Sequence, residues 1–225
     1  NGLVQITVFA YTFLKKKIFF ASAGLTKKVH HQLIINEIKD LMPRNVLEVG
    51  SGNGINLRIL SSLFKKINFN GIDQSENGIM FSKKLKNELL IKEYVNPLEY
   101  DFDLSTKPLN LDYSLGDAKN LKFEDNKFDL VYTILALEQM DNIKLQVLKE
   151  LKRVSKKTIV LIEPFPELNN KNILKFLHHN SKQYFNLHHK KTIDENWKIK
   201  KFITNVPTKL TLGYGMLVLE KVKFN

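Results

Sequence analysis

Residues 45–54, with the sequence NVLEVGSGNG, constrain the fold of this chain more than any other stretch. Their first half is a short apolar run, typical of a buried strand, and apolar residues at helical spacing follow their end. Between the two, Gly50, Gly52 and Gly54 alternate with polar residues. Glycine tolerates positive φ and lets other groups approach the backbone closely. We therefore expect a tight strand-to-helix turn whose free N–H groups point into a cleft and suit a polar or anionic ligand.

The spacing of these glycines narrows the choice of ligand. A dinucleotide-binding turn has glycine at its first, third and sixth positions. Counted from Gly50 or Gly52, the sixth position holds Ile55 or Leu57. No Gly-Lys-Ser/Thr triplet follows the turn, so a phosphate-binding P-loop is excluded as well. An ordinary strand-to-helix turn with no ligand remains the alternative at this point.

The composition limits the size of the fold, the kinds of site and the partners that this chain can have. The chain has 225 residues, 43% of them hydrophobic, which suits one α/β domain with or without a small cap. It contains no cysteine, so disulfides, thiol nucleophiles and cysteine–metal sites are excluded. The net charge of +12 raises the question of a nucleic-acid or membrane partner. Because lysines are scattered along the chain and the arginines are only Arg44, Arg58 and Arg153, we do not expect nucleic-acid binding.

Apolar periodicity and Gly/Pro positions predict alternating helices and strands. Helices are expected over 26–41, from 55 onward, and over 77–92 and 144–154. Strands are expected over 45–49, 67–72, 111–115, from 129 onward, and over 158–163, 198–205 and 214–222. Residues 94–110 interrupt the pattern and are expected to form a solvated insertion. His30 and His31, near the start of the first helix, are expected at the surface.

Asp73 follows the second predicted strand, about 20 residues after the glycine turn. A carboxylate at this place can accept hydrogen bonds from both hydroxyl groups of a ribose. The alternative is that Asp73 caps the next helix, a role that Ser75 could also fill.

Two motifs give the chain a family resemblance. The pattern Glu-x-Gly-x-Gly-x-Gly, which begins at Glu48, resembles the first motif of class I S-adenosylmethionine (SAM)-dependent methyltransferases. Residues 116–131 read G-D-A-x-x-L-x-F-x-D-x-x-F-D-L-V and resemble the third and fourth motifs of the small-molecule group of that family. The resemblance implies a Rossmann-like, doubly wound, mostly parallel seven-stranded sheet with helices on both faces.

The resemblance also implies roles for single residues. Asp117 would accept a hydrogen bond from the adenine amino group, with the N–H of Ala118 near the ring. Thr133, Ile134 and Leu135, at the end of the fourth strand, would line the methionine part of SAM, and Asp129 would be structural. Apart from Leu135, the predicted cofactor site consists of Glu48, Gly50, Ser51, Gly52, Asn53, Gly54, Asp73, Gln74, Asp117, Ala118, Thr133 and Ile134.

The expected layout is an N-terminal segment, 1–25, that forms a helical cap, followed by a methyltransferase domain over 26–225. A cap-like insertion at about 165–197 should cover the site. The apolar run near the N-terminus is too short to span a bilayer, and its basic residues come after it rather than before it, unlike a secretory signal. A cytoplasmic location is therefore expected, with weak membrane-surface contact as an alternative.

The predicted function is methyl transfer from SAM to an oxygen or nitrogen of a small molecule, with S-adenosylhomocysteine as the other product. Candidate bases are Glu138, Glu163, His178 and His179. Methylation of RNA or protein, and non-catalytic SAM binding on the same fold, are the alternatives. No metal is expected, because adjacent histidines on a helix point in different directions. The identity of the acceptor and the oligomeric state are not determined by the sequence.

Overall fold

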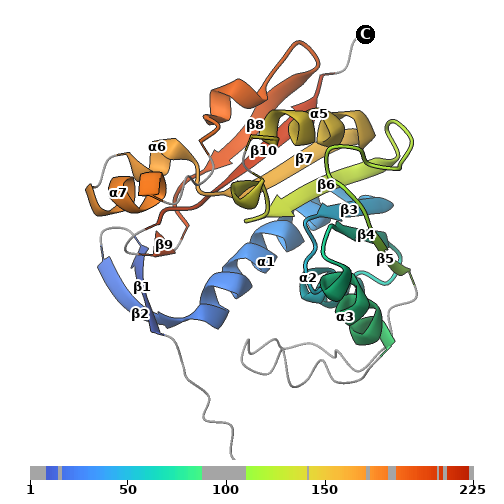
Figure 1. The fold of residues 1–225 in the computed structure, drawn as a ribbon, viewed down its shortest axis with the longest axis horizontal. Coiled ribbons are helices and arrows are strands. Elements are labelled where there is room, and N and C mark those ends of the chain that lie inside the picture. The colour runs from blue at the N-terminus through green and yellow to red at the C-terminus, as the bar shows by residue number, and fades with distance from the viewer. Residues whose placement is uncertain are drawn as a thin grey trace, which may run out of the picture.

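The structure is a computed structural model that describes residues 9–14, 17–87, 110–140, 142–170, 173–181, 186–206, 208–209 and 212–222. Its centre is a seven-stranded sheet with the order β5-β4-β3-β6-β7-β10-β8 (Figure 1). The strands are β3 (Asn45–Val49), β4 (Asn68–Asp73), β5 (Leu111–Leu115), β6 (Phe128–Ile134), β7 (Ser155–Glu163), β8 (Trp197–Ile203) and β10 (Gly215–Lys221). The first five of these pair in parallel, whereas β10 is antiparallel to both β7 and β8. The predicted Rossmann-like fold is confirmed.

Helices cover both faces of this sheet (Figure 1). They are α1 (Ala23–Leu41), α2 (Ile55–Leu63), α3 (Glu76–Asn87), α5 (Lys144–Val154), α6 (Pro166–Asn169) and α7 (Ile173–Ser181), with the 3₁₀ turns η2 (Leu137–Gln139) and η3 (His189–Thr192). One core cluster joins α1, α2 and α3 to the sheet through residues such as Ile38, Leu60 and Ile79. The other joins α5 to the opposite face through Val147 and Leu151. Each such buried aliphatic side chain contributes about 1.5–3 kcal/mol, which holds the helices to the sheet.

The strand order reverses between β3 and β6. From β3 the chain proceeds to β4 and β5 on one side, and then crosses to β6 and β7 on the other. At such a switch point the connections leave the carboxyl edge of the sheet in opposite directions and open a crevice. The glycine turn leaves β3 at this edge, so the fold places it beside the crevice.

The N-terminal segment differs from the prediction. Where a helical cap was expected, β1 (Phe9–Leu14) and β2 (Lys17–Ser22) form an antiparallel hairpin, and β9 (Thr208–Lys209) adds a third strand to it. The helix prediction was wrong because the segments FAYTFL and KIFFAS are rich in aromatic and β-branched residues, which favour strands. The third strand comes from almost 200 residues further along the chain, so local sequence could not show it.

Most other boundaries agree within a few residues. The strand predicted over 158–163 begins at Ser155, because Ser155 pairs with Phe128 at the start of β6. Residues 88–92 of one predicted helix and 94–109 of the predicted insertion lie outside the described residues. Within the described parts of the chain, no helix is both long enough and apolar enough to cross a membrane.

Candidate cofactor and active site

A cavity of about 360 Å³ lies at the carboxyl edge of the sheet, around the switch point. Its size is within the range of small-molecule sites in proteins. The lining comes from the ends of β3, β4, β5 and β6 and from the segment after β6. The lining residues are Val49, Gly50, Gly52, Ile72, Asp73, Gln74, Gly116, Asp117, Ala118, Ile134, Leu135, Ala136, Gln139, Met140 and Ile143.

The glycine turn has the conformation that the sequence predicts. The φ angles of Gly50, Gly52 and Gly54 are 77°, 53° and 75°, all in the left-handed region. A Cβ atom on Gly50 would lie only 2.4 Å from the Cβ of Ala136, because the two residues are in direct contact at the edge of the cavity. Glycine is therefore required at position 50 both by backbone conformation and by close packing. At Gly52, by contrast, an added Cβ would meet nothing within 4 Å, so it is this part of the turn that leaves room for a nucleoside close to the backbone.

The expected free N–H groups are not found at the glycines. The N–H groups of Gly50 and Ser51 both donate to the carbonyl of Ile72, at 2.9 and 3.0 Å. The N–H of Gly52 donates to Oδ2 of Asp73 at 2.7 Å. The prediction that these amides face a ligand was wrong, because the turn uses them to fasten itself to β4. The turn thus offers the ligand space and shape rather than donors at these three positions.

The carboxylate of Asp73 holds two backbone segments and also lines the cavity. Its Oδ2 accepts from Gly52, and its Oδ1 accepts from the N–H of Ser75 at 2.8 Å. Ser75 itself caps α3, since its Oγ accepts from the N–H of Gly78 at 3.1 Å. A carboxylate has about four acceptor positions, so the side chain retains capacity for a ligand in the cavity that it lines.

The loop that carries Asp117 and Ala118 is held from outside the cavity. Asp117 accepts from the N–H of Lys119 at 2.9 Å, which closes a local turn. Further along, Nη2 of Arg153 donates to the carbonyl of Leu121 and Nη1 donates to that of Phe123, both at 2.8 Å.

Glu150 completes this support. Its Oε2 accepts from the N–H of Leu121 and from Arg153, and the bond with Arg153 lowers the pKa of the Glu150 carboxyl. Arg153 also binds Asp125, and Asp129 accepts from the N–H groups of Arg44 and Asn45 at the start of β3. The later positions of the 116–131 motif are therefore structural, as predicted for Asp129.

Glu48 does not line the cavity. It is fully buried behind the glycine turn, and its Oε1 accepts from Nδ2 of Asn56 at 2.7 Å. Oδ1 of Asn56 in turn accepts from Nε2 of His31 at 2.7 Å. Burial raises the pKa of Glu48 to about 8. The carboxyl thus connects β3, α2 and α1, and a direct cofactor contact has no support from this placement.

The same chain of contacts corrects the prediction for the first histidines. His31 is 1% exposed and His30 is 4% exposed, so neither is a surface residue. His30 packs edge-on against the ring of Tyr214, with ring centroids 5.8 Å apart. Tertiary packing of α1 on the sheet buries a face that its sequence does not mark as apolar.

Four other predicted cofactor residues also lie outside the lining. Ser51 is buried and Asn53 is exposed at the turn. Gly54 precedes α2, and its carbonyl accepts from the hydroxyl of Tyr113 at 2.6 Å. Thr133 is fully buried, and its hydroxyl donates to Oε1 of Glu163 at 2.8 Å. Seven of the predicted residues do line the cavity, namely Gly50, Gly52, Asp73, Gln74, Asp117, Ala118 and Ile134.

None of the four candidate bases lines the cavity. Glu163 is fully buried, and its burial raises the pKa of its carboxyl to about 8. His179 is buried as well, and its Nε2 donates to the carbonyl of Pro164 at 3.0 Å. Glu138 and His178 are half-buried, on η2 and α7. The described residues of 165–197 contribute nothing to the lining either, so the covering role of this segment stays a prediction.

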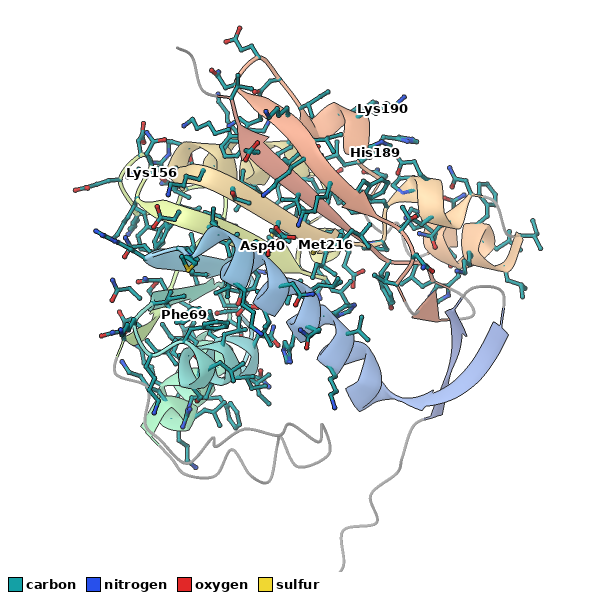
Figure 2. All side chains as sticks on the ribbon, turned by 180° about the vertical axis from the view of Figure 1, so that it is seen from behind. Asp40, Phe69, Lys156, His189, Lys190 and Met216 are labelled. Carbon is teal, nitrogen blue, oxygen red and sulfur yellow. The ribbon has the colours of Figure 1, made fainter. Side chains whose placement is uncertain are left out.

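The second histidine pair binds a glutamate. Nδ1 of His188 and Nδ1 of His189 lie 3.0 and 2.8 Å from Oε1 of Glu167, and His189 stacks on Phe202. His189 and Lys190 lie at the periphery of the molecule, beside β8 (Figure 2). Among the described residues, no group of three His, Cys, Asp or Glu side chains could hold a metal ion.

Sequence reasoning missed most of the wall that follows β6. Ala136, Gln139, Met140 and Ile143 line the cavity, yet no motif marks them. The sequence feature that could have identified them is their position directly after a parallel strand at the switch point, where ligands bind in such sheets. Leu135, the first residue of this wall, was expected from the family resemblance, and its φ of 51° is unusual for a residue with a side chain.

Comparison with known proteins agrees with this geometry. Residues 47–162, just over half of the chain, match a family described as a methyltransferase domain. A search of curated proteins found no match to this chain.

Solved structures show the same fold at low sequence identity. A SAM-dependent methyltransferase from Methanosarcina mazei aligns with a TM-score of 0.63 and 17% identity, over 84% of this chain and 98% of its own. A Haloferax volcanii protein in complex with the Trm112 methyltransferase activator aligns at 0.61 and 16%, over 89% and 93%. A Galdieria sulphuraria protein, whose proposed name is sarcosine dimethylglycine methyltransferase, aligns at 0.59 and 12%, over 87% and 85%.

The matched family spans the glycine turn, the Asp73 and Asp117 loops and the strand before the cavity wall. The chain belongs to the methyltransferase domain family and is a class I SAM-dependent methyltransferase.

Proposed function

We propose that the cavity binds SAM and that the protein transfers its methyl group to an oxygen or nitrogen of a small-molecule acceptor. The observation that carries this proposal is the lining, in which a left-handed glycine turn and two carboxylates meet an apolar wall. When bound, SAM supplies an electrophilic methyl group on a positively charged sulfur.

In this proposal the chain mainly binds and orients. Asp73 accepts from the ribose hydroxyls, and Asp117 accepts from the adenine amino group beside Ala118. The glycine turn admits the ligand close to the backbone. Ile134, Leu135 and Met140 exclude water from the reacting groups. An in-line displacement depends strongly on such alignment.

The acceptor class is tested by incubating the full chain with methyl-labelled SAM and separate small-molecule, RNA and protein fractions. We expect label in the small-molecule fraction. Transfer of label to RNA or protein would replace the acceptor class with one of the alternatives. S-adenosylhomocysteine binding without a labelled product in any fraction would favour a non-catalytic SAM-binding protein. The cytoplasmic location and weak membrane contact also stay predictions from the sequence.

The role of Asp73 has its own test. Asp73→Asn keeps the size of the side chain but removes one acceptor oxygen. We expect S-adenosylhomocysteine to bind about 5- to 150-fold more weakly by calorimetry, equivalent to about 1–3 kcal/mol for unpaired ribose hydroxyls.

An analogue without the 2′-hydroxyl separates a direct contact from damage to the turn. If Asp73 binds the ribose, the substitution should weaken the analogue much less than the parent nucleoside. Equal losses for both ligands would mean that Asp73 acts only by holding Gly52 and Ser75.

A further inference from the structure

Glu163 occupies a position that the proposed reaction does not explain. It is the last residue of β7 and is 0% exposed. Its Oε1 accepts from the hydroxyl of Thr133 at 2.8 Å and from the N–H groups of Leu137 and Ala136 at 3.1 and 3.3 Å. Its Oε2 accepts from the N–H of Glu138 at 3.3 Å. One buried carboxyl thus accepts from the hydroxyl of Thr133 near the end of β6 and from three successive N–H groups, those of residues 136–138, at the start of η2.

This turn needs such a support. The first N–H groups of a helical turn have no partner within the turn, and burial without a partner costs about 1–3 kcal/mol for each. Leu135 precedes them with a φ of 51°, a conformation that persists only where the surroundings impose it. The N–H of Leu135 donates to the carbonyl of Ile162, the residue before Glu163. The end of β7 therefore fixes both the backbone of the turn and its direction.

The turn is also one wall of the cavity. Ala136, Gln139 and Met140 line it, whereas Glu163 does not. Ala136 faces Gly50 so closely that a Cβ on Gly50 would lie 2.4 Å from the Cβ of Ala136. A shift of η2 by a fraction of an ångström would therefore change the gap between the wall and the glycine turn.

From this geometry we propose that Glu163 is a positioning residue, which sets the wall of the cavity through the backbone of residues 136–138. This positioning role replaces the role of general base that the sequence suggested for Glu163. The inference rests on the proposed function of the cavity. An ionised or neutral carboxyl can accept these bonds, but an aliphatic side chain cannot.

The test uses the full chain and compares Glu163→Gln and Glu163→Ala with the wild type. The amide keeps one acceptor oxygen, so the loss should be graded. By NMR we expect amide hydrogen exchange to rise at least 10-fold at residue 138 in Glu163→Gln, because its N–H loses the Oε2 acceptor, and at all of residues 136–138 in Glu163→Ala. Calorimetry should show S-adenosylhomocysteine binding about 10-fold more weakly to Glu163→Gln. If Glu163→Ala does not fold, the Gln variant carries the test.

Asn169→Ala is the matched control. Asn169 is also 0% exposed, and its three hydrogen bonds join the backbone of Gly213 and Phe165 rather than that of η2. We expect this variant to expose the amide of Gly213 and to keep ligand affinity within about 2-fold.

Two outcomes would overturn the inference. One is unchanged exchange at residue 138 in Glu163→Gln. The other is an equal loss of affinity in Asn169→Ala, which would assign the effect to general destabilisation. Failure of the wild type to bind S-adenosylhomocysteine would instead overturn the proposed function, while the exchange pattern would still decide whether Glu163 holds the turn.

Discussion

Replacement of Gly50 by alanine is expected to lower stability by about 2–4 kcal/mol and S-adenosylhomocysteine affinity by about 100-fold. The positive φ of 77° accounts for about 1 kcal/mol of this loss. Overpacking against Ala136, whose Cβ would lie at 2.4 Å, adds about 1–3 kcal/mol. Urea unfolding and calorimetry measure the two effects.

Two further variants isolate the contact. Gly52 has a φ of 53°, and a Cβ there meets nothing within 4 Å, so Gly52→Ala should lose only about 1 kcal/mol of stability. In the double variant with Gly50→Ala, Ala136→Gly removes the opposing methyl group and should restore part of the loss. A double variant no better than Gly50→Ala would show that the contact does not determine the effect.

Glu48 and Glu163 are expected to make the free energy of unfolding fall as pH rises between about 5 and 8. Burial raises the pKa of each carboxyl from 4.5 to about 8. Below pH 4.5 both the folded and unfolded forms are protonated, so the groups contribute no slope. Between the two pKa values the unfolded chain releases these protons and the folded chain keeps them. Stability therefore falls as pH rises between these two values, because the unfolded chain binds fewer protons than the folded chain.

Urea unfolding of the wild type, Glu48→Gln and Glu163→Gln at several pH values between 5 and 8 measures this slope. Each substitution removes one titrating group and should make the curve less steep, whatever the other groups contribute. Slopes equal to that of the wild type would show that the carboxyls titrate alike in the folded and unfolded chain. Because Glu48 contacts Asn56 rather than η2, its variant should leave exchange at residues 136–138 unchanged.

The motifs led to the correct family and to half of the site. Gly50, Gly52, Asp73 and Asp117 line the cavity as predicted, because a strand, a turn and a following helix fix their positions within a few residues. Asp129 has the structural role predicted for it, because its carboxylate accepts hydrogen bonds from the N–H groups of Arg44 and Asn45.

The failures share a physical cause. The free amides expected at the glycine turn are bonded to Ile72 and Asp73, which come from the next strand. Glu48 and Glu163 resemble functional carboxylates in the sequence, but the structure buries both away from the cavity. A carboxyl's role depends on which donors surround it, and those donors come from other elements.

By itself, the sequence determined the order of strands and helices, the left-handed turn at Gly50 and the family, because periodicity and glycine content act over a few residues. The tertiary structure decided the third strand of the N-terminal sheet, the burial of His31 and the wall held by Glu163. These depend on contacts between residues about 25 or more positions apart, such as His31 with Asn56 and Thr133 with Glu163. Packing of the sheet against its helices brings such residues together, and no local pattern encodes it.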